Sequence, residues 1–383
     1  MNNQFTEITT NSWGSRILKS IKGVLVGFLM FLASFGVLYW NEGRVDVSKI
    51  AETATEIPTN TQVSNELDNQ LVSLTGTLKS DEKLGDTYIK KGDYLSLQRS
   101  VQMYAWRENK STNSQRNTGG SETTETTYDY VQEWTSMPQD SSNFKYPEGH
   151  QNPELTVQNS YATVSTASIG SYSLQMNQLD LSFESTLNLN NSNVNSVNGV
   201  SLANEKYLFK GNGSLDTPQI GDIRIMYKAI NNPVNTSTVF GTLDIQNQLI
   251  SPFYGQKNTK LYRAFDGSRE GAISTMSSEY KTTTWLIRLG GFLLMWFGLL
   301  GMLQPISVFL DVLPIFGSIS RVGLGLTAFI VALVLSIVTI IISIVFHNLI
   351  ILTLVILGLI GWFSFMYKKK NSSASIPAPP SIK

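Results

Sequence analysis

The sequence predicts a multi-pass membrane protein with four transmembrane α-helices, one N-terminal and three C-terminal. A large β-rich (α+β) non-cytoplasmic domain is predicted between the first helix and the second. Uncharged apolar runs lie towards both ends of the chain, and strand-like alternation fills the part between them. Of the 29 acidic residues, 27 lie between residues 41 and 284, where 20 basic residues leave a net charge of −7; the flanks carry +7. This segregation of charge fits a protein whose basic flanks stay in the cytoplasm and whose acidic central domain is exported.

Residues 23–40 form the first predicted span, because 18 uncharged residues are close to the lower limit for a helix that crosses a bilayer. A cleaved signal peptide is the weaker interpretation, since Trp-Asn-Glu follows the run where small residues would mark a cleavage site. A buried core helix is also weaker, because the run has no polar face beyond Ser34. We therefore interpret the run as a signal-anchor that follows a cytoplasmic segment, residues 1–22.

The C-terminal part is expected to hold the other three spans. Pro305 and Pro314 are expected to end the second one. Residues 322–367 are 46 uncharged positions, about twice a bilayer thickness as a helix, so they must fold back, and His347-Asn348 is the expected turn. The predicted segments are 286–304 (second span), 305–321 (cytoplasmic loop or interfacial segment), 322–346 and 349–367 (third and fourth spans) and 368–383 (disordered cytoplasmic tail).

Basic residues next to the outer spans predict the orientation. Arg16, Lys19 and Lys22 precede the first span, and Lys368, Lys369 and Lys370 follow the last. Four spans put both termini on the same side of the membrane. We therefore expect a protein of the cell membrane with both termini in the cytoplasm. Residues 41–284 then form the non-cytoplasmic domain.

The domain at 41–284 is expected to be β-rich, because it contains runs of β-branched and aromatic residues with partial period-two alternation. Gly, Asn, Asp or Pro separates these runs. Two stretches, 111–127 and 187–199, contain few apolar residues and are interpreted as mobile loops. The expected strands lie within 94–106, 126–134, 206–211, 222–230 and 237–245.

Sites for chemistry are scarce in this sequence. There is no cysteine, and the two histidines, His150 and His347, occur without a serine-nucleophile, zinc-protease or phosphate-loop motif. The predicted spans have no ionisable residue near their centres, which disfavours an ion or proton carrier. We expect no enzyme activity, no catalytic residue, no cofactor, no metal site and no nucleic-acid partner.

Two groups of residues are candidates for other roles. Glycines four or seven residues apart allow helices to approach closely, either between copies or within one bundle. Aromatic and charged residues at the outer ends of the first two spans form a candidate interaction and topology motif, in which Glu42 pairs with Arg44 or Arg288; a generic interfacial belt is the simpler interpretation. The helix-packing candidates are Gly23, Gly27, Gly291 and Gly298, and the motif comprises Trp40, Asn41, Glu42, Gly43, Arg44, Trp285 and Arg288.

Five stretches, in order, resemble the transmembrane protein 43 (LUMA) family. They are "ASFGVLYWNEGR" (33–44), "RSVQMYAWRE" (99–108), "YDYVQEW" with "GHQNPE" (128–134 and 149–154), "PQIGDIRIMY" (218–227) and "TWLIRLGGFLLMWFGL" (284–299). The resemblance implies four spans, a large non-cytoplasmic domain and no catalytic activity. For a eukaryotic member it implies the endoplasmic reticulum and inner nuclear membrane, with lamins and emerin as partners. The absence of cysteine and the abundance of Lys, Asn, Ser and Thr indicate a bacterial member of the family. For a bacterial member, the part of the family's role that applies is scaffolding at a membrane.

Two functions from different classes follow. The first is a scaffold that organises membrane protein complexes or envelope structure through the non-cytoplasmic domain, with membrane lipids, other membrane proteins and further copies of itself as partners. The second is a lipid- or ligand-binding membrane receptor or sensor, with an apolar cavity lined by Met103, Tyr104 and Trp106.

Overall fold

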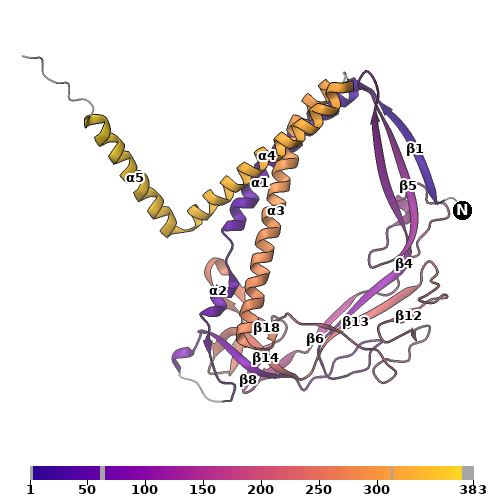
Figure 1. Ribbon diagram of the computed structural model, residues 1–383. Helices are drawn as coiled ribbons and strands as arrows, with labels where there is room; N and C mark the ends of the chain where they lie inside the picture. The colour runs from indigo at the N-terminus through magenta and orange to yellow at the C-terminus, as the bar shows by residue number, and fades with distance from the viewer. Residues whose placement is uncertain (1–2, 61–64, 312–313, 373–383) are drawn as a thin grey trace, which may run out of the picture. The chain divides into compact units, whose positions relative to one another are not determined.

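The computed structural model describes residues 3–60, 65–311 and 314–372 (Figure 1). The chain folds into two compact units, each assembled from separate stretches of sequence. Unit 1 contains the β-rich domain, and unit 2 contains the long apolar helices. Unit 1 comprises Met1–Thr10, Val45–Gln115 and Thr123–Lys281, and unit 2 comprises Asn11–Arg44, Arg116–Glu122 and Thr282–Lys383.

Unit 1 is built mainly from two sheets, which confirms the predicted β-rich domain. The first sheet has the order β1-β5-β4-β13-β12-β11, with β6 on β4 and β10 on β13. Its strands are β1 (Gln4–Asn11), β4 (Tyr94–Arg116), β5 (Glu122–Thr135), β6 (Ser160–Thr163), β10 (Ser185–Thr186), β11 (Ser201–Leu202), β12 (Leu208–Lys210) and β13 (Ile223–Asn231).

The second sheet has the order β2-β3-β7-β8-β15-β14-β18-β9, and β14 also pairs with β3. The pairings β3-β7-β8-β15-β14-β3 therefore form a closed ring of strands. Val72, Leu174 and Ile250 are among the side chains of this ring that are buried in one apolar core. The strands are β2 (Thr55–Glu56), β3 (Leu71–Lys79), β7 (Thr166–Ile169), β8 (Tyr172–Gln175), β9 (Asp180–Leu181), β14 (Val234–Asp244), β15 (Leu249–Ser251) and β18 (Arg263–Asp266); β16 (Phe253–Tyr254) and β17 (Lys260–Leu261) pair separately.

The antiparallel β4–β13 pair shows why the period-two pattern predicted strands here. Ile223 lies opposite Met103, and Ile225 lies opposite Val101, with all four side chains turned into a second apolar core. Polar neighbours such as Arg224 and Gln102 occupy the alternate positions and hydrogen-bond across the pair at 2.7 Å.

The interpretation of residues 111–127 as a mobile loop is wrong over most of its length. β4 continues to Arg116 and β5 begins at Glu122, so only a short turn separates them. Thr and Ser side chains need no apolar core to form a strand, and Ser114 and Thr124 hydrogen-bond across the pair at 3.0 Å. In the second predicted loop, 187–199, Leu189 is almost completely buried, and Asn190 and Asn193 hydrogen-bond to nearby backbone groups.

Short helices complete unit 1. Helix α2 (Val47–Glu52) packs beside the first turns of α3 (Arg269–Leu310), where Ala51 and Met276 lie in a third core. Arg269 donates to the carbonyl groups of Ala51 (3.3 Å) and Ala54 (3.0 Å), which lie at and just after the C-terminal end of α2. The 3₁₀ turns are η1 (Asn65–Leu67), η2 (Ser141–Asn143) and η3 (Gln256–Asn258).

Strand β1 was not predicted. The sequence topology puts residues 1–22 and 41–284 on opposite sides of a membrane, yet β1 is a neighbour of β5 in one sheet. The Tyr130 N–H donates to the Asn3 carbonyl at 2.8 Å, and Phe5 stacks on Tyr146 with ring centres 4.3 Å apart. Strands of one sheet share one aqueous side, so this pairing disagrees with that part of the predicted topology.

Unit 2 contains α1 (Trp13–Glu42), the rest of α3, α4 (Pro314–His347) and α5 (Leu349–Ser372). Of the described helices, those of the α1, α3 and α4 segments are long and apolar enough to cross a membrane, whereas the apolar stretch of α5, Ile350–Met366, is shorter. Membrane helices are thus confirmed, while the number four and the orientation stay predictions. Residues 312–313 and 373–383, within the predicted loop and tail, lie outside the described residues.

The end of α3 differs from the end predicted from the sequence, whereas the break between α4 and α5 lies at the predicted position. α3 does not end at Pro305 but continues to Leu310, because a proline removes only one hydrogen bond and packing against a neighbouring helix retains the helical path. A helix break lies at the predicted turn His347-Asn348, since α4 ends at His347 and α5 begins at Leu349. That the chain folds back across a membrane there stays a prediction.

Candidate functional site

The residues of the candidate motif come together in unit 2, where α1 ends and the apolar part of α3 begins. Glu42 accepts two hydrogen bonds from Arg288, with Nε–Oε1 at 2.9 Å and Nη2–Oε2 at 2.7 Å. The Glu42 side chain is 5% exposed and that of Arg288 21%. Of the two partners considered for Glu42, the structure has Arg288. A bidentate pair of this kind is among the strongest polar contacts in proteins.

Asn41 fixes the same junction through the backbone of α3. Its side chain is fully buried, and Nδ2 donates to the Thr284 carbonyl at 3.2 Å. Arg44 donates back to Asn41 Oδ1 at 3.5 Å. The end of α1 and the start of the apolar part of α3 therefore lie side by side. The Thr284 hydroxyl is buried without a hydrogen-bond partner among the described residues.

The two tryptophans lie on the outside of this junction. Trp40 is 61% exposed and Trp285 is 68% exposed. The Arg44 guanidinium lies 5.9 Å from the Trp40 ring centre, and that of Arg288 lies 4.9 Å from the Trp285 ring centre. Tryptophan and arginine together suit the headgroup layer of a bilayer, and cation–π contact orders both side chains.

Helix α4 joins the junction through His347, which the sequence analysis placed only at an expected turn. His347 is an exposed residue, and its ring centre lies 4.5 Å from that of Tyr39 in α1. Its Nδ1 contacts the Ser343 carbonyl at 2.9 Å, and Ser343 Oγ donates to the Tyr39 carbonyl at 3.1 Å. A Cβ on Gly43 would collide with the His347 ring, which gives a reason for glycine there. We name Trp40–Arg44, Thr284, Trp285, Arg288 and His347 the exit cluster.

The four candidate packing glycines all line the contact between α1 and α3 within one bundle. A Cβ on Gly27 would lie 2.7 Å from the Gly298 carbonyl oxygen, and one on Gly298 would lie 2.7 Å from the Phe31 nitrogen. These neighbours are backbone atoms, so the two helices approach each other only because side chains are absent. Gly23 meets Gln304, and Gly291 meets Leu38. Sequence reasoning missed Gly301, whose Cβ would lie 3.0 Å from the Gly27 Cα.

His150 is a core residue of unit 1. It is 1% exposed, stacks on Tyr130 with ring centres 4.0 Å apart and meets the Trp106 ring edge-on at 4.8 Å. Its two ring nitrogens contact the Tyr146 carbonyl and Asn3 Oδ1, each at 3.2 Å. A buried ring with both nitrogens engaged suits packing better than proton transfer to a substrate.

Other residues of the quoted sequence motifs also hold the fold together. The Asn152 amide exchanges two hydrogen bonds with the Trp106 backbone, at 2.7 and 2.8 Å. The buried Asp222 carboxylate accepts from the backbone N–H groups of Asn212 and Gln219, at 2.9 and 2.7 Å. These contacts join strands to loops, which is a structural role.

The surroundings of Tyr130, in unit 1, raise the pKa of its hydroxyl. Its hydroxyl donates to Glu108 Oε2 at 2.5 Å and accepts from the Tyr146 N–H at 2.8 Å. Burial, reinforced by the hydrogen bond to Glu108, raises the pKa of Tyr130 from 10.0 to about 12. Between pH 10 and about 12 the Tyr130 hydroxyl keeps its proton in the folded state but loses it in the unfolded state. The contribution of this hydroxyl to the free energy of unfolding is therefore complete below pH 10 and declines as the pH rises towards 12.

We expect Tyr130→Phe to flatten the loss of stability between pH 10 and about 12, because the ionising hydroxyl is gone. Urea unfolding across this pH range, with phenolate absorbance to follow ionisation, measures the effect. Tyr254→Phe, at an exposed tyrosine of the same unit, is the matched control and should leave the curve unchanged. Equal curves for wild type and Tyr130→Phe would contradict the assignment.

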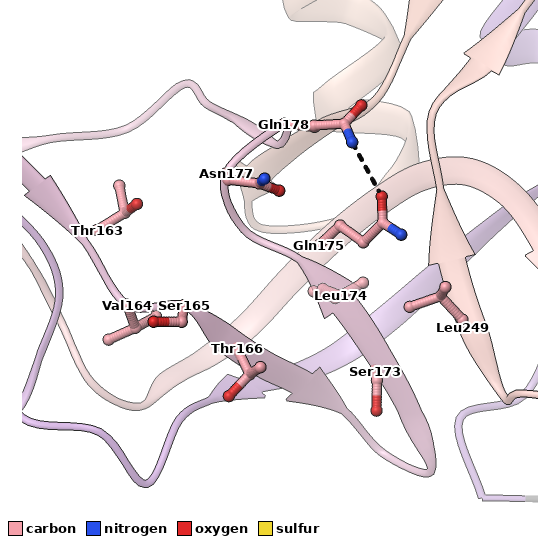
Figure 2. Close-up of a pocket in the computed structure, with 10 residues that line it drawn as sticks. All are labelled: Thr163, Val164, Ser165, Thr166, Ser173, Leu174, Gln175, Asn177, Gln178 and Leu249. Atoms are coloured by element: carbon pink, nitrogen blue, oxygen red, sulfur yellow. Dashed lines mark hydrogen bonds between the residues drawn. The ribbon is translucent and has the colours of Figure 1, made fainter.

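Figure 2 shows a pocket of unit 1, of about 560 Å³, beside β7, β8 and β15. Its lining side chains are uncharged, and Gln178 donates to Gln175 Oε1 across it at 3.1 Å. Met103, Tyr104 and Trp106 are not among its lining residues, which are Thr163, Val164, Ser165, Thr166, Ser173, Leu174, Gln175, Asn177, Gln178 and Leu249. We assign the pocket no role.

The three residues predicted to line a ligand cavity have different surroundings. Met103 is fully buried in the second core, Tyr104 contacts Trp134 with ring centres 5.4 Å apart, and Trp106 packs on His150. Within the part of the chain that the structure describes, no cluster of three or more His, Cys, Asp or Glu side chains could hold a metal ion.

An apolar helical bundle with a buried polar cluster at one end, in a chain that also forms a large β-rich unit, defines an integral membrane protein with a large non-helical domain. The sequence model of the family "Transmembrane protein 43" matches residues 103–349, and the chain belongs to this family. The resemblance noted in the sequence is thereby confirmed.

Related proteins match most of the chain. It is 26% identical to transmembrane protein 43 of Mus musculus and of Homo sapiens over 342 residues, which is 85% of this chain and 84% of each relative. It is 26% identical to the transmembrane protein 43 homolog of Drosophila melanogaster over 290 residues, 72% of this chain and 74% of the relative. No solved structure matches the chain.

Proposed function

We propose that this protein is a non-enzymatic membrane scaffold, which organises membrane protein complexes or envelope structure through its β-rich domain. The exit cluster is the observation that carries the proposal. It joins α1, α3 and α4 by a bidentate ion pair, a buried amide and a histidine contact. Such contacts stabilise a bundle without forming a reaction centre. A fixed helical anchor with an attached domain is what a scaffold requires.

The partners that we propose are membrane lipids, other membrane proteins and further copies of this chain. Trp40 and Trp285 present large exposed surfaces beside the buried ion pair. Exposed aromatic side chains next to ordered arginines are typical of interaction hot spots as well as of the lipid headgroup layer. The protein partners are therefore expected to contact the exit cluster.

A site-specific photocrosslinker tests this contact. Inserted at Trp285 in native membranes, it should yield discrete adducts with protein partners or with a second copy. The matched control is the same crosslinker at Leu357, which is 59% exposed on the apolar helix α5 and should meet lipid. Identical adducts at both positions, or none at Trp285, would contradict the proposal.

A lipid- or ligand-binding receptor or sensor is the alternative function. It requires a cavity that retains a lipid or small molecule through purification. Mass spectrometry that finds one defined lipid bound to each copy, with no partner adduct, would favour this alternative over the scaffold.

A further inference from the structure

Four charged side chains of unit 2, two of them buried, form a second polar cluster at the opposite end of α1 from the exit cluster. Arg16 Nη2 lies 2.6 Å from Asp311 Oδ2, and Arg16 Nε lies 3.1 Å from Glu122 Oε2. Arg116 Nη1 lies 3.0 Å from the other oxygen of Asp311. We call Arg16, Arg116, Glu122 and Asp311 the charge quartet.

The charge quartet is balanced, because two arginines face two carboxylates. Asp311 and Arg16 are also its most buried members, with side chains 1% and 5% exposed. Buried charges persist only where each has an opposite charge and hydrogen-bond partners. Asp311 is one of two acidic residues outside 41–284, and this contact provides a reason for its position.

The charge quartet joins three distant segments of the chain. Arg16 belongs to the first turn of α1, Asp311 directly follows α3, and Arg116 and Glu122 flank the turn between β4 and β5. Arg16 also donates to the carbonyl of Gly120 in that turn. Near these residues, Trp13 Nε1 donates to the Val308 carbonyl at 3.0 Å.

The turn itself is built to enter this contact. Gly119 and Gly120 have φ angles of +86° and +81°, which side-chain-bearing residues rarely adopt. Gly120 is buried, and a Cβ on it would collide with the Trp13 ring. The Asn117 N–H donates to the Ser121 carbonyl at 2.9 Å and closes the turn.

We propose that the charge quartet is a latch, which fastens the β4–β5 turn to the start of α1 and the end of α3. The residues of the turn, 116–122, then lie on the same side of the membrane as the segment before the first apolar run. Polar strands and turns are not stable in hydrocarbon, so this side is aqueous or a water-filled space. Sequence topology puts the two segments on opposite sides. The proposal is independent of the scaffold function.

The absence of native cysteine allows a direct crosslinking test in the full-length chain. A Cβ on Gly120 would lie 3.4 Å from the Trp13 Cβ, close to the separation that a disulfide needs. We expect Trp13→Cys/Gly120→Cys to form an intramolecular disulfide in native membranes under mild oxidation. Trp13→Cys/Gly199→Cys is the matched control: Gly199 also has a positive φ, +75°, but its Cβ would have no neighbour within 4 Å.

The contribution of the charges is tested in the same double-cysteine chain. Asp311→Asn should lower the disulfide yield about tenfold, because Arg16 and Arg116 lose their shared carboxylate. Glu42→Gln, which breaks an ion pair at the other end of α1, should leave the yield unchanged. An undiminished yield in Asp311→Asn, or no disulfide in the parent pair, would overturn the latch.

Sidedness is measured on single-cysteine chains that leave the charge quartet intact. Thr9→Cys, in β1, and Thr118→Cys, in the turn, are both exposed positions. A membrane-impermeant maleimide should label both in intact cells, or both only after permeabilisation. Labelling of one in intact cells and of the other only after permeabilisation would overturn the proposal.

Discussion

Replacing Glu42 by Gln is expected to lower the free energy of unfolding by about 3–5 kcal/mol. The amide keeps the shape of the side chain but removes the negative charge that faces Arg288 at 2.7 Å. Because Glu42 is almost completely buried, water does not replace the lost ion pair. Unfolding of the purified protein in nanodiscs by denaturant, followed by tryptophan fluorescence, measures the change.

Glu52→Gln is the control for this variant. Glu52 is an exposed carboxylate at the end of α2, so its loss should change stability by less than about 0.5 kcal/mol. The double variant Glu42→Gln/Arg288→Gln should be more stable than the sum of the single losses predicts, since both charges are then gone. Additive losses would show that the pair does not contribute as a unit.

Alanine substitutions at two glycines of α3 are expected to have effects of opposite sign. Gly298→Ala puts a methyl group 2.7 Å from the Phe31 nitrogen and 2.8 Å from the Gly27 carbonyl oxygen. The helices must separate, at a cost of about 1–3 kcal/mol. Gly290→Ala meets no atom within 4 Å and should stabilise the helix by about 0.5–1 kcal/mol. The same nanodisc unfolding assay measures both variants.

Comparing Gly298→Ala with Gly290→Ala tests whether α1 and α3 pack closely through glycine, or whether glycine is merely common in apolar helices. If Gly298→Ala were as stable as Gly290→Ala, the two helices would not approach through Gly27 and Gly298. In that case the glycines would have no packing role within the bundle.

The sequence predicted those features that depend on local pattern. Period-two alternation identified β4 and β13, and uncharged length identified the helices, because each signal comes from neighbouring residues. The helix break at His347-Asn348 was located for the same reason. The extension of β4 and β5 through residues 111–127 was missed, since cross-strand pairing rather than apolar content stabilises that hairpin.

Contacts between distant residues were harder to predict. Glu42 had two arginines as candidate partners, and spacing alone did not decide between Arg44 and Arg288. His347 beside Gly43, and Asp311 beside Arg16, join residues about 300 positions apart, for which a single sequence carries no signal. The glycine spacing at Gly23 and Gly27 did indicate close helix packing, but not which helix was the partner.

Native mass spectrometry of the full-length protein in nanodiscs tests the scaffold proposal most directly. It measures self-assembly, bound partners and bound lipid in one experiment. The scaffold account predicts discrete assemblies of the chain with itself or with a co-purified membrane protein, which Trp285→Ala weakens at the exit cluster. A strictly monomeric protein, with no partner and one tightly bound lipid, would contradict it.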